Sequence, residues 1–326
     1  MKTLVIAGGT GFLGQLLEHH FLAQGYRVIL LSRRPRADHH VAWDGKTLGP
    51  WTDALEDANV LINLCGKSVD CRYTDANREV ILRSRIDSTQ VLGKAIADAE
   101  RPPALWLNAS SATIYVHAEH QRMTEEAGII GDDFSMSVCR EWEEAFFDFD
   151  LPSTRQVALR TSIVLGHGGG AYPKIKSITR LGGGGYQGSG RQWMSWIHAT
   201  DFCRALDFIM NHQGVSGAVN VTAPHPVRNR SFMQSVRSAL NVPFGLSQPA
   251  ALLELGACLL GTETELLLKS RHVYPERLLT AGFTFRWGTI EEALRNLENP
   301  SDNKESSSNA RRFPNKNALK MSNKEG

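Results

Sequence analysis

Short apolar runs alternate with amphipathic stretches through the first half of the chain. The predicted strands cover residues 2–7, 26–31, 59–64, 104–110 and 154–165, and the predicted helices cover residues 12–25, 74–99 and 137–149. Each strand is almost entirely apolar, which is typical of strands that helices cover on both faces. Strands that alternate with helices predict βαβ units and a doubly wound parallel sheet of the α/β class.

The composition changes after about Leu181, where the glycine-rich stretch GGGGYQGSG predicts a flexible loop on the substrate side. Further strands are predicted at 193–198 and 217–223, and further helices at 200–212, 229–241, 249–260, 264–270, 275–283 and 289–297. We therefore expect a dinucleotide-binding domain with substrate-side insertions over 1–240 and a small, mostly helical C-terminal domain over 241–298. Residues 299–326 are polar and poor in apolar side chains, so a disordered tail is predicted there.

Composition restricts the class of protein. The 326 residues are 42% hydrophobic and 21% charged, with a net charge of +2, as in a globular protein. Five cysteines, none in a CxxC pair, indicate no disulfide framework and no metal site, which favours the cytoplasm. We expect no membrane span, because no stretch reaches about 18 apolar residues. Because the basic residues are scattered, nucleic-acid binding is not expected.

The sequence GGTGFLG follows the first predicted strand and opens the first helix. In that context Gly8 allows a tight turn, Gly11 lets backbone approach a pyrophosphate, and Gly14 lets the helix pack closely on the strand. The predicted cofactor-binding residues of this turn are Gly8, Thr10, Gly11, Phe12, Leu13 and Gly14. The motif predicts a Rossmann-type nucleotide site, and the alternative is a plain connection between a strand and a helix.

The end of the second strand predicts which nucleotide is bound. An NAD enzyme places Asp or Glu there for the ribose 2′-hydroxyl, whereas this chain has Ser32, Arg33 and Arg34. A hydroxyl and two guanidinium groups favour a 2′-phosphate, so NADP is expected rather than NAD. The alternative is that these arginines only solvate a loop. Leu64, Cys65 and Gly66, after the next predicted strand, are expected on the adenine-ribose side.

With GGTGFLG, NLCG and NASSATIY, the chain resembles the extended short-chain dehydrogenase/reductases, and more closely an atypical subgroup usually named epimerase family protein. Its motifs here are NLCG (63–66), SRIDST (84–89), SSATIY (110–115), VCREWE (138–143), LRTSIVLG (159–166), GSGRQWMSWIHATD (188–201), PVRN (226–229) and FRW (285–287). The match spans nearly the whole chain except the tail. It implies a Rossmann-type sheet, a nicotinamide cofactor and a small-molecule substrate.

The resemblance also implies a catalytic set, which is incomplete here. Ser111 stands where a serine binds the reacting carbonyl, but Ser135 and Cys139 stand where a tyrosine and a lysine are usual, and Arg85 replaces a supporting asparagine. Arg85 is predicted to contact the cofactor. Cys139 near Arg85 could act as a thiolate proton acceptor, the alternative being an inert buried cysteine. Tyr115 is a secondary candidate for the proton donor.

The segment 188–201 offers a candidate substrate surface. Arg191, Trp193, Trp196 and His198 are predicted to bind an anionic or sugar-like ligand by charge, stacking and proton relay. The alternative is that 196–198 is simply a strand, that Asp201 caps the next helix, and that Asn229 caps a later one.

Three functions follow from these residues. The first is an NADP-dependent oxidoreductase or epimerase with an altered proton donor. The second is a sensor that binds NADP(H) or a metabolite without turnover, because both the tyrosine and the lysine are absent. The third, a regulator that binds other proteins, has the least support. The expected partners are a small-molecule substrate and a second copy of the chain.

Overall fold

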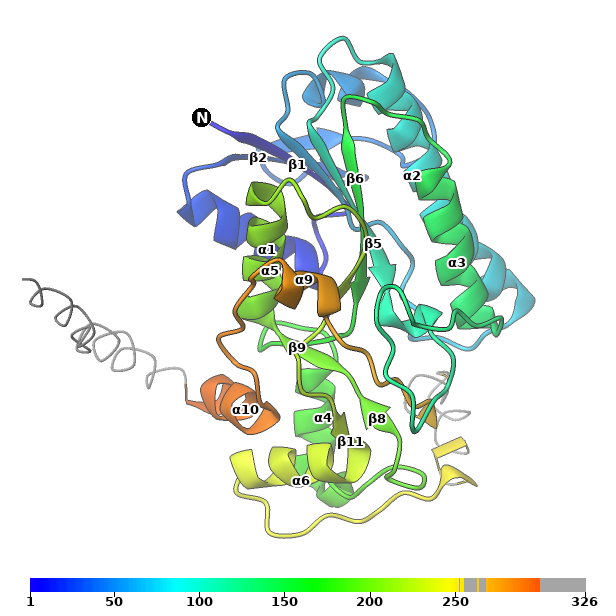
Figure 1. Ribbon diagram of the computed structural model, residues 1–326, viewed down its shortest axis with the longest axis vertical. Helices are drawn as coiled ribbons and strands as arrows, with labels where there is room; N and C mark the ends of the chain where they lie inside the picture. The colour runs from blue at the N-terminus through cyan, green and yellow to red at the C-terminus, as the bar shows by residue number, and fades with distance from the viewer. Residues whose placement is uncertain (252, 255–262, 264–267, 300–326) are drawn as a thin grey trace, which may run out of the picture.

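A seven-stranded parallel sheet forms the centre of the computed structural model, which describes residues 1–251, 253–254, 263 and 268–299 (Figure 1). The strands run in the order β10-β6-β5-β4-β1-β2-β3. They are β1 (Thr3–Ala7), β2 (Arg27–Ser32), β3 (His40–Ala42), β4 (Val60–Asn63), β5 (Leu105–Ser111), β6 (Arg155–Thr161) and β10 (Gly217–Val221). The sheet is the predicted doubly wound Rossmann type, with the order reversing between β1 and β4, where such sheets bind ligands.

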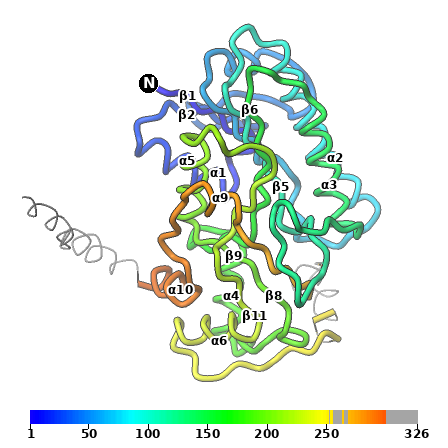
Figure 2. Tube along the Cα trace, viewed as in Figure 1, coloured from blue at the N-terminus to red at the C-terminus, as the bar shows by residue number. Residues whose placement is uncertain are grey.

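Helices cover both faces of this sheet, as Figures 1 and 2 show. α1 (Phe12–Ala23) and α5 (Ala199–Asn211) pack on one face, where Phe21 and Phe202 join a single apolar core. α2 (Asp75–Asp98) and α3 (Phe134–Phe147) pack on the other, where Leu92 and Phe146 belong to a second core. Burial on both faces explains the nearly continuous apolar runs in the strands.

A second, smaller lobe lies beyond the carboxyl ends of the strands (Figure 1). Its elements are β7 (Ile163–Leu165), α4 (Tyr172–Ile178), η3 (Thr179–Gly183), β8 (Trp193–Met194), β9 (Trp196–His198), β11 (Val227–Arg228), α6 (Asn229–Ala239) and α10 (Ile290–Glu298). One apolar core joins residues such as Phe232 of α6 and Leu294 of α10. This core contains residues from both sides of residue 240, where the boundary between the two domains is predicted. The short helix α9 (Glu276–Thr280) instead contacts β10 of the large sheet.

Two predicted helix caps differ from the structure. α5 is capped by the imidazole of His198, whose Nδ1 accepts a hydrogen bond from Thr200 N at 3.1 Å, rather than by Asp201. The fully buried Asp201 carboxylate accepts from the backbone N–H groups of Arg286 and Trp287, which fastens the FRW segment to α5. Asn229 lies inside α6, and its side chain binds Gln187 instead of capping the helix.

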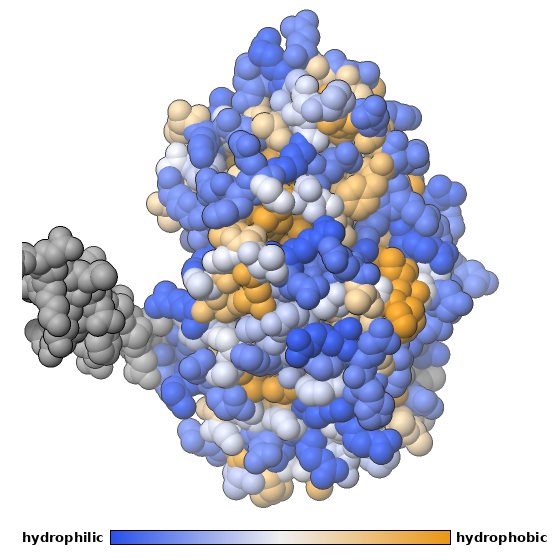
Figure 3. Space-filling model, in the orientation of Figure 1, coloured by the Kyte–Doolittle hydropathy of each residue, from blue (hydrophilic) through white to orange (hydrophobic). Residues whose placement is uncertain are grey.

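Some predictions concern residues outside the described ranges. These residues make up the larger part of the two helices predicted at 249–260 and 264–270, and residues 300–326 of the predicted tail. Among the helices that the structure describes, none is long and apolar enough to cross a membrane. The face seen in Figure 3 is largely hydrophilic, with apolar areas separated by polar ones.

Candidate functional site

The turn between β1 and α1 has the geometry of a phosphate cradle. Gly8 has φ +74°, which favours glycine, and a Cβ there would lie 2.9 Å from the Cys65 sulfur. A Cβ on Gly14 would lie 2.1 Å from the Gly9 carbonyl oxygen, so the close packing predicted for Gly14 is present. A Cβ on Gly11, the N-cap of α1, would meet nothing within 4 Å. Open space therefore adjoins the free N–H groups of the helix, as a pyrophosphate requires.

The other predicted residues of this turn surround the cradle. Thr10 is exposed, Leu13 packs on the core below, and the Phe12 ring lies under the loop 166–170. A Cβ on Gly166 or Gly169 would come within 2.9 Å of that ring. Glycines in this loop thus let it close over α1 beside the cradle.

Ser32, Arg33 and Arg34 lie at the carboxyl end of β2, at the same edge of the sheet as the cradle. Ser32 is buried, and its Oγ accepts from Arg34 N at 3.2 Å, which shapes the turn. Arg33 and Arg34 are exposed, and in the described part of the chain neither makes an ion pair. The turn therefore presents two uncommitted guanidinium groups and no carboxylate of its own.

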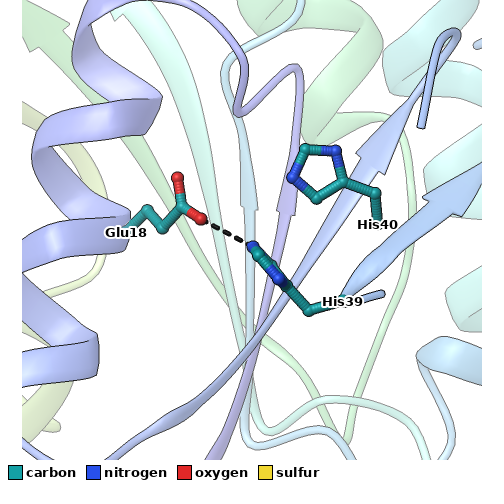
Figure 4. A group of neighbouring side chains, drawn as sticks. All are labelled: Glu18, His39 and His40. Atoms are coloured by element: carbon teal, nitrogen blue, oxygen red, sulfur yellow. Dashed lines mark hydrogen bonds and ion pairs between the residues drawn. The ribbon is translucent and has the colours of Figure 1, made fainter. Parts of the chain in front are cut away.

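A side-chain contact ties the arginine-bearing loop to α1. Glu18 Oε1 of α1 and His39 Nε2 lie 2.7 Å apart, and the His40 ring faces the same gap (Figure 4). One ligand atom from each of Glu18, His39 and His40 lies within 4.8 Å of the others, a spacing that can hold a metal ion. The Glu18–His39 contact fixes the loop that carries Arg33 and Arg34 against the first helix.

The segment after β4 is shaped by a buried network of amides. Asn63 donates from Nδ2 to Asn108 Oδ1 at 2.7 Å, and its own Oδ1 accepts from Cys65 N at 3.0 Å. This bond curls Leu64, Cys65 and Gly66 towards the glycine turn, where Cys65 touches Gly8. Burial raises the pKa of the Cys65 thiol to about 12, so this cysteine stays neutral and packs beside the glycine turn.

A cavity of about 90 Å³ lies between α2, α3 and the end of β5. Its lining residues are Val69, Ile81, Arg85, Ser111, Thr113, Phe134, Ser135, Val138, Cys139 and Trp142. Four positions predicted from distant motifs, Arg85, Ser111, Ser135 and Cys139, therefore meet at one place. The Ser111 hydroxyl accepts from Thr113 N at 3.1 Å and donates to Thr113 Oγ1 at 2.9 Å, which fixes it at the cavity wall.

Cys139 is a neutral thiol in this cavity. Burial raises its pKa to about 12, and the nearby positive charge of Arg85 lowers it only in part. At neutral pH almost no thiolate is present, so the geometry favours the alternative of a packed cysteine over a proton acceptor.

Tyr115 lies away from the cavity, in a buried polar network. Its hydroxyl donates to Asn220 Oδ1 at 2.8 Å and accepts from Arg160 Nη1 at 2.9 Å, and burial raises its pKa. Arg160 in turn binds Glu143 through Nε at 2.8 Å and Nη2 at 2.7 Å. Glu143 also accepts from Ser110 Oγ at 2.5 Å. The network positions the end of β5, next to Ser111, and leaves Tyr115 no path to a ligand in the cavity.

The predicted substrate residues of 188–201 have mixed surroundings. Arg191 is exposed, with its Nε 3.9 Å from Glu119, and Trp193 is partly buried between the His272 ring and the Arg228 guanidinium. Trp196 is fully buried in the core of the small lobe. His198 is a buried helix cap, and burial is the main reason that its pKa falls to about 4. Trp196, His198 and Trp193 thus have structural contacts, and Arg191 is the exposed member of the four.

The sequence predictions did not include several residues that line the cavity or lie beside it. Trp142 closes one wall and donates from Nε1 to Thr89 Oγ1 at 2.9 Å. Tyr73 packs on Phe134, and its hydroxyl lies 3.4 Å from Ser135 Oγ. Trp142 belongs to the VCREWE motif and could have been singled out from it. Tyr73 and Phe134 are brought to the site by tertiary packing, and no local pattern in the sequence predicts that contact.

A larger recess of about 490 Å³ lies at the opposite edge of the sheet, beside Lys2, Val60, Leu105 and Arg155. These residues stand at or beside the amino ends of the strands, whereas open α/β sheets bind ligands at the carboxyl ends. The Arg155 guanidinium is already bound to the carbonyl groups of Val215 and Ile209. The smaller cavity is therefore the better candidate site.

Comparison with protein families agrees with this geometry. Residues 4–131 match the NAD dependent epimerase/dehydratase family, and residues 248–297 match a domain of unknown function, DUF1731. The Bacillus subtilis epimerase family protein YfhF is 32% identical over 299 residues, which are 90% of this chain and 97% of the relative.

Two solved structures show the same fold. The human epimerase family protein SDR39U1 (isoform 2), crystallised with NADPH, superimposes with a TM-score of 0.83 and 30% identity, covering 91% of this chain and 99% of that one. A nucleoside-diphosphate sugar epimerase from Corynebacterium glutamicum has a TM-score of 0.75 and 27% identity, covering 95% of this chain and 61% of that one.

Proposed function

Because the chain belongs to the epimerase family proteins, an atypical group of extended short-chain dehydrogenase/reductases, we propose that it is an NADP(H)-dependent oxidoreductase or epimerase. The observation that carries this proposal is the edge of the sheet at β1 and β2. Open space over Gly11 and two uncommitted arginines after β2 provide for a pyrophosphate and for a 2′-phosphate. The NADPH in the related human structure supports the same choice.

The residues present fit the nucleotide. The N-terminus of α1 would hold the pyrophosphate, Arg33 and Arg34 the 2′-phosphate, and the segment Leu64–Gly66 the adenosine side. When bound, the nicotinamide supplies a hydride donor or acceptor. The chain's own contribution at the cavity is to hold the reacting substrate oxygen through Ser111.

The proton donor differs from that of ordinary family members. Ser135 and Cys139 cannot replace an ionisable tyrosine beside a lysine, since a serine hydroxyl does not titrate near neutral pH and the thiol pKa is raised to about 12. We therefore assign the proton to solvent that enters by the cavity mouth. Arg191 and Trp193 are the side chains proposed to contact the remainder of a sugar-like or anionic substrate.

A screen for NADPH oxidation tests this function. Purified chain with NADPH is presented with a panel of carbonyl compounds, including nucleotide sugars and keto acids, and the absorbance of the reduced nicotinamide is followed. We expect at least one compound to be reduced, with a large loss of kcat in Ser111→Ala and none in Ser137→Ala, whose hydroxyl binds the Asp132 carbonyl on the outer side of α3.

The loss of both tyrosine and lysine favours a second candidate, a non-catalytic sensor of NADP(H). Binding of NADPH without oxidation by any compound of the panel would support the sensor over the enzyme. Failure to bind NADPH at all would overturn both.

A further inference from the structure

The guanidinium of Arg85 faces the cavity, and within the described ranges most of its N–H donors make no hydrogen bond. Its Nη1 donates to the Ile81 carbonyl at 2.7 Å, and a guanidinium has five such N–H donors. In the described part of the chain no carboxylate forms an ion pair with it. The Trp142 ring lies 5.1 Å away, and Gly66 leaves room for the group, because a Cβ there would lie 3.1 Å from Arg85 Cζ.

Arg160, a second arginine near Cys139, has the opposite surroundings. The Nε and Nη2 atoms of Arg160 both donate to the Glu143 carboxylate, so the Arg160 charge is neutralised within the chain. Arg85 is partly buried and has no such partner among the residues that the structure describes, an arrangement that costs free energy unless an anion completes it. Arg271 adds further positive charge near Cys139.

The cavity has the size and the donors for one anionic group. Its volume of about 90 Å³ accommodates only a few heavy atoms. Besides Arg85 it presents the hydroxyl of Ser135, and its other walls include the apolar side chains of Ile81 and Val138. A planar guanidinium fork with a hydroxyl beside it matches the two oxygens of a carboxylate.

We propose that Arg85 and Ser135 form a binding site for a carboxylate beside Ser111, and that the substrate is therefore an organic acid. That this anion belongs to the substrate rests on the function proposed above. The binding of a carboxylate to the cavity does not depend on the nucleotide, so the two proposals can fail separately.

Acetate is the probe for this site, because it is a carboxylate with a single methyl group. Its binding to the purified full-length chain, without nucleotide, is followed by line broadening of ¹³C-labelled acetate in NMR. We expect saturable binding that weakens at least about tenfold in Arg85→Met, which corresponds to about 1.4 kcal/mol. Arg85→Lys should retain part of the affinity, since it keeps the charge but loses the fork.

Arg83→Met is the matched control. Arg83 lies on the same helix but is exposed and paired with Glu79 at 2.9 Å, so acetate binding should not change. Acetamide, which has a similar shape and no charge, should not bind. The proposal is overturned if acetate fails to bind the wild-type chain, or if Arg85→Met and Arg83→Met, both with wild-type circular dichroism, bind acetate equally. Ser135→Ala keeps the test decisive if Arg85→Met does not fold, because the proposal requires weaker acetate binding there too.

Discussion

Replacement of Glu143 by glutamine should destabilise the chain strongly. The carboxylate accepts three hydrogen bonds, from Ser110 Oγ and from Nε and Nη2 of Arg160, and the Arg160 and Glu143 side chains are only 7% and 9% exposed. Glu143→Gln keeps the shape but leaves the Arg160 charge buried without a counter-ion. Removal of one partner of such a pair costs about 3–5 kcal/mol. We expect a loss of that size in the free energy of unfolding.

Urea unfolding, followed by tryptophan fluorescence, measures this loss. The control is Glu144→Gln, the next residue of the same helix, whose side chain is 66% exposed and pairs only loosely with Arg140 at 3.7 Å. That variant should change the free energy of unfolding by less than about 0.5 kcal/mol. A double variant with Glu143→Leu and Arg160→Met should be more stable than Glu143→Gln, because it buries no unpaired charge. Equal stability of Glu143→Gln and Glu144→Gln would refute the reasoning.

Three further predictions concern the glycine turn, Cys139 and His198. Gly14→Ala should unfold at lower urea concentration than wild type, because its Cβ would lie 2.1 Å from the Gly9 carbonyl oxygen. Gly11→Ala should keep wild-type stability and bind NADPH more weakly. A Gly11→Ala variant that is less stable than Gly14→Ala would contradict the proposed geometry of the phosphate cradle. With a pKa of about 12, Cys139 in the native chain should react with iodoacetamide at pH 8 about a thousandfold more slowly than an exposed thiol, and rapid alkylation detected by mass spectrometry would contradict its burial. Burial lowers the pKa of His198 from 6.5 to about 4, so the unfolded chain binds a proton at this residue more readily than the folded chain. The contribution of His198 to the free energy of unfolding is therefore fully present above pH 6.5 and is lost as the pH falls to 4. The loss is about 3 kcal/mol. Urea unfolding across this pH range should show that the stability of His198→Asn, in which asparagine can still cap α5, depends less on pH than that of the wild type. The same dependence of stability on pH in both chains would count against the lowered pKa of His198.

The first half of the fold was predictable because its signals are local. The apolar runs at β1, β2, β4 and β5 and the glycines of 8–14 each specify their own structure. The three-residue strand β3 was not predicted, since a stretch that short has no period. α4 was also missed, because the glycines before it and Pro173 favour a loop, although proline is well tolerated in the first turn of a helix.

The site was predictable only where a family motif marks a position. Ser111, Ser135 and Cys139 were placed by resemblance, and the structure brings them to one cavity with Arg85. Nothing in the local sequence indicates that His198 caps a helix. The functional roles of these site residues stay predictions until ligand binding is measured.

The most direct test of the nucleotide assignment is the ratio of the dissociation constants for NADPH and NADH, measured by titration of nicotinamide fluorescence. We predict that NADPH binds much more tightly, and that Arg33→Ala with Arg34→Ala removes this preference. Arg27→Ala, at the exposed amino end of the same strand, should leave it unchanged. Equal affinity for the two nucleotides in the wild-type chain, or a preference that survives the loss of both Arg33 and Arg34, would contradict the account.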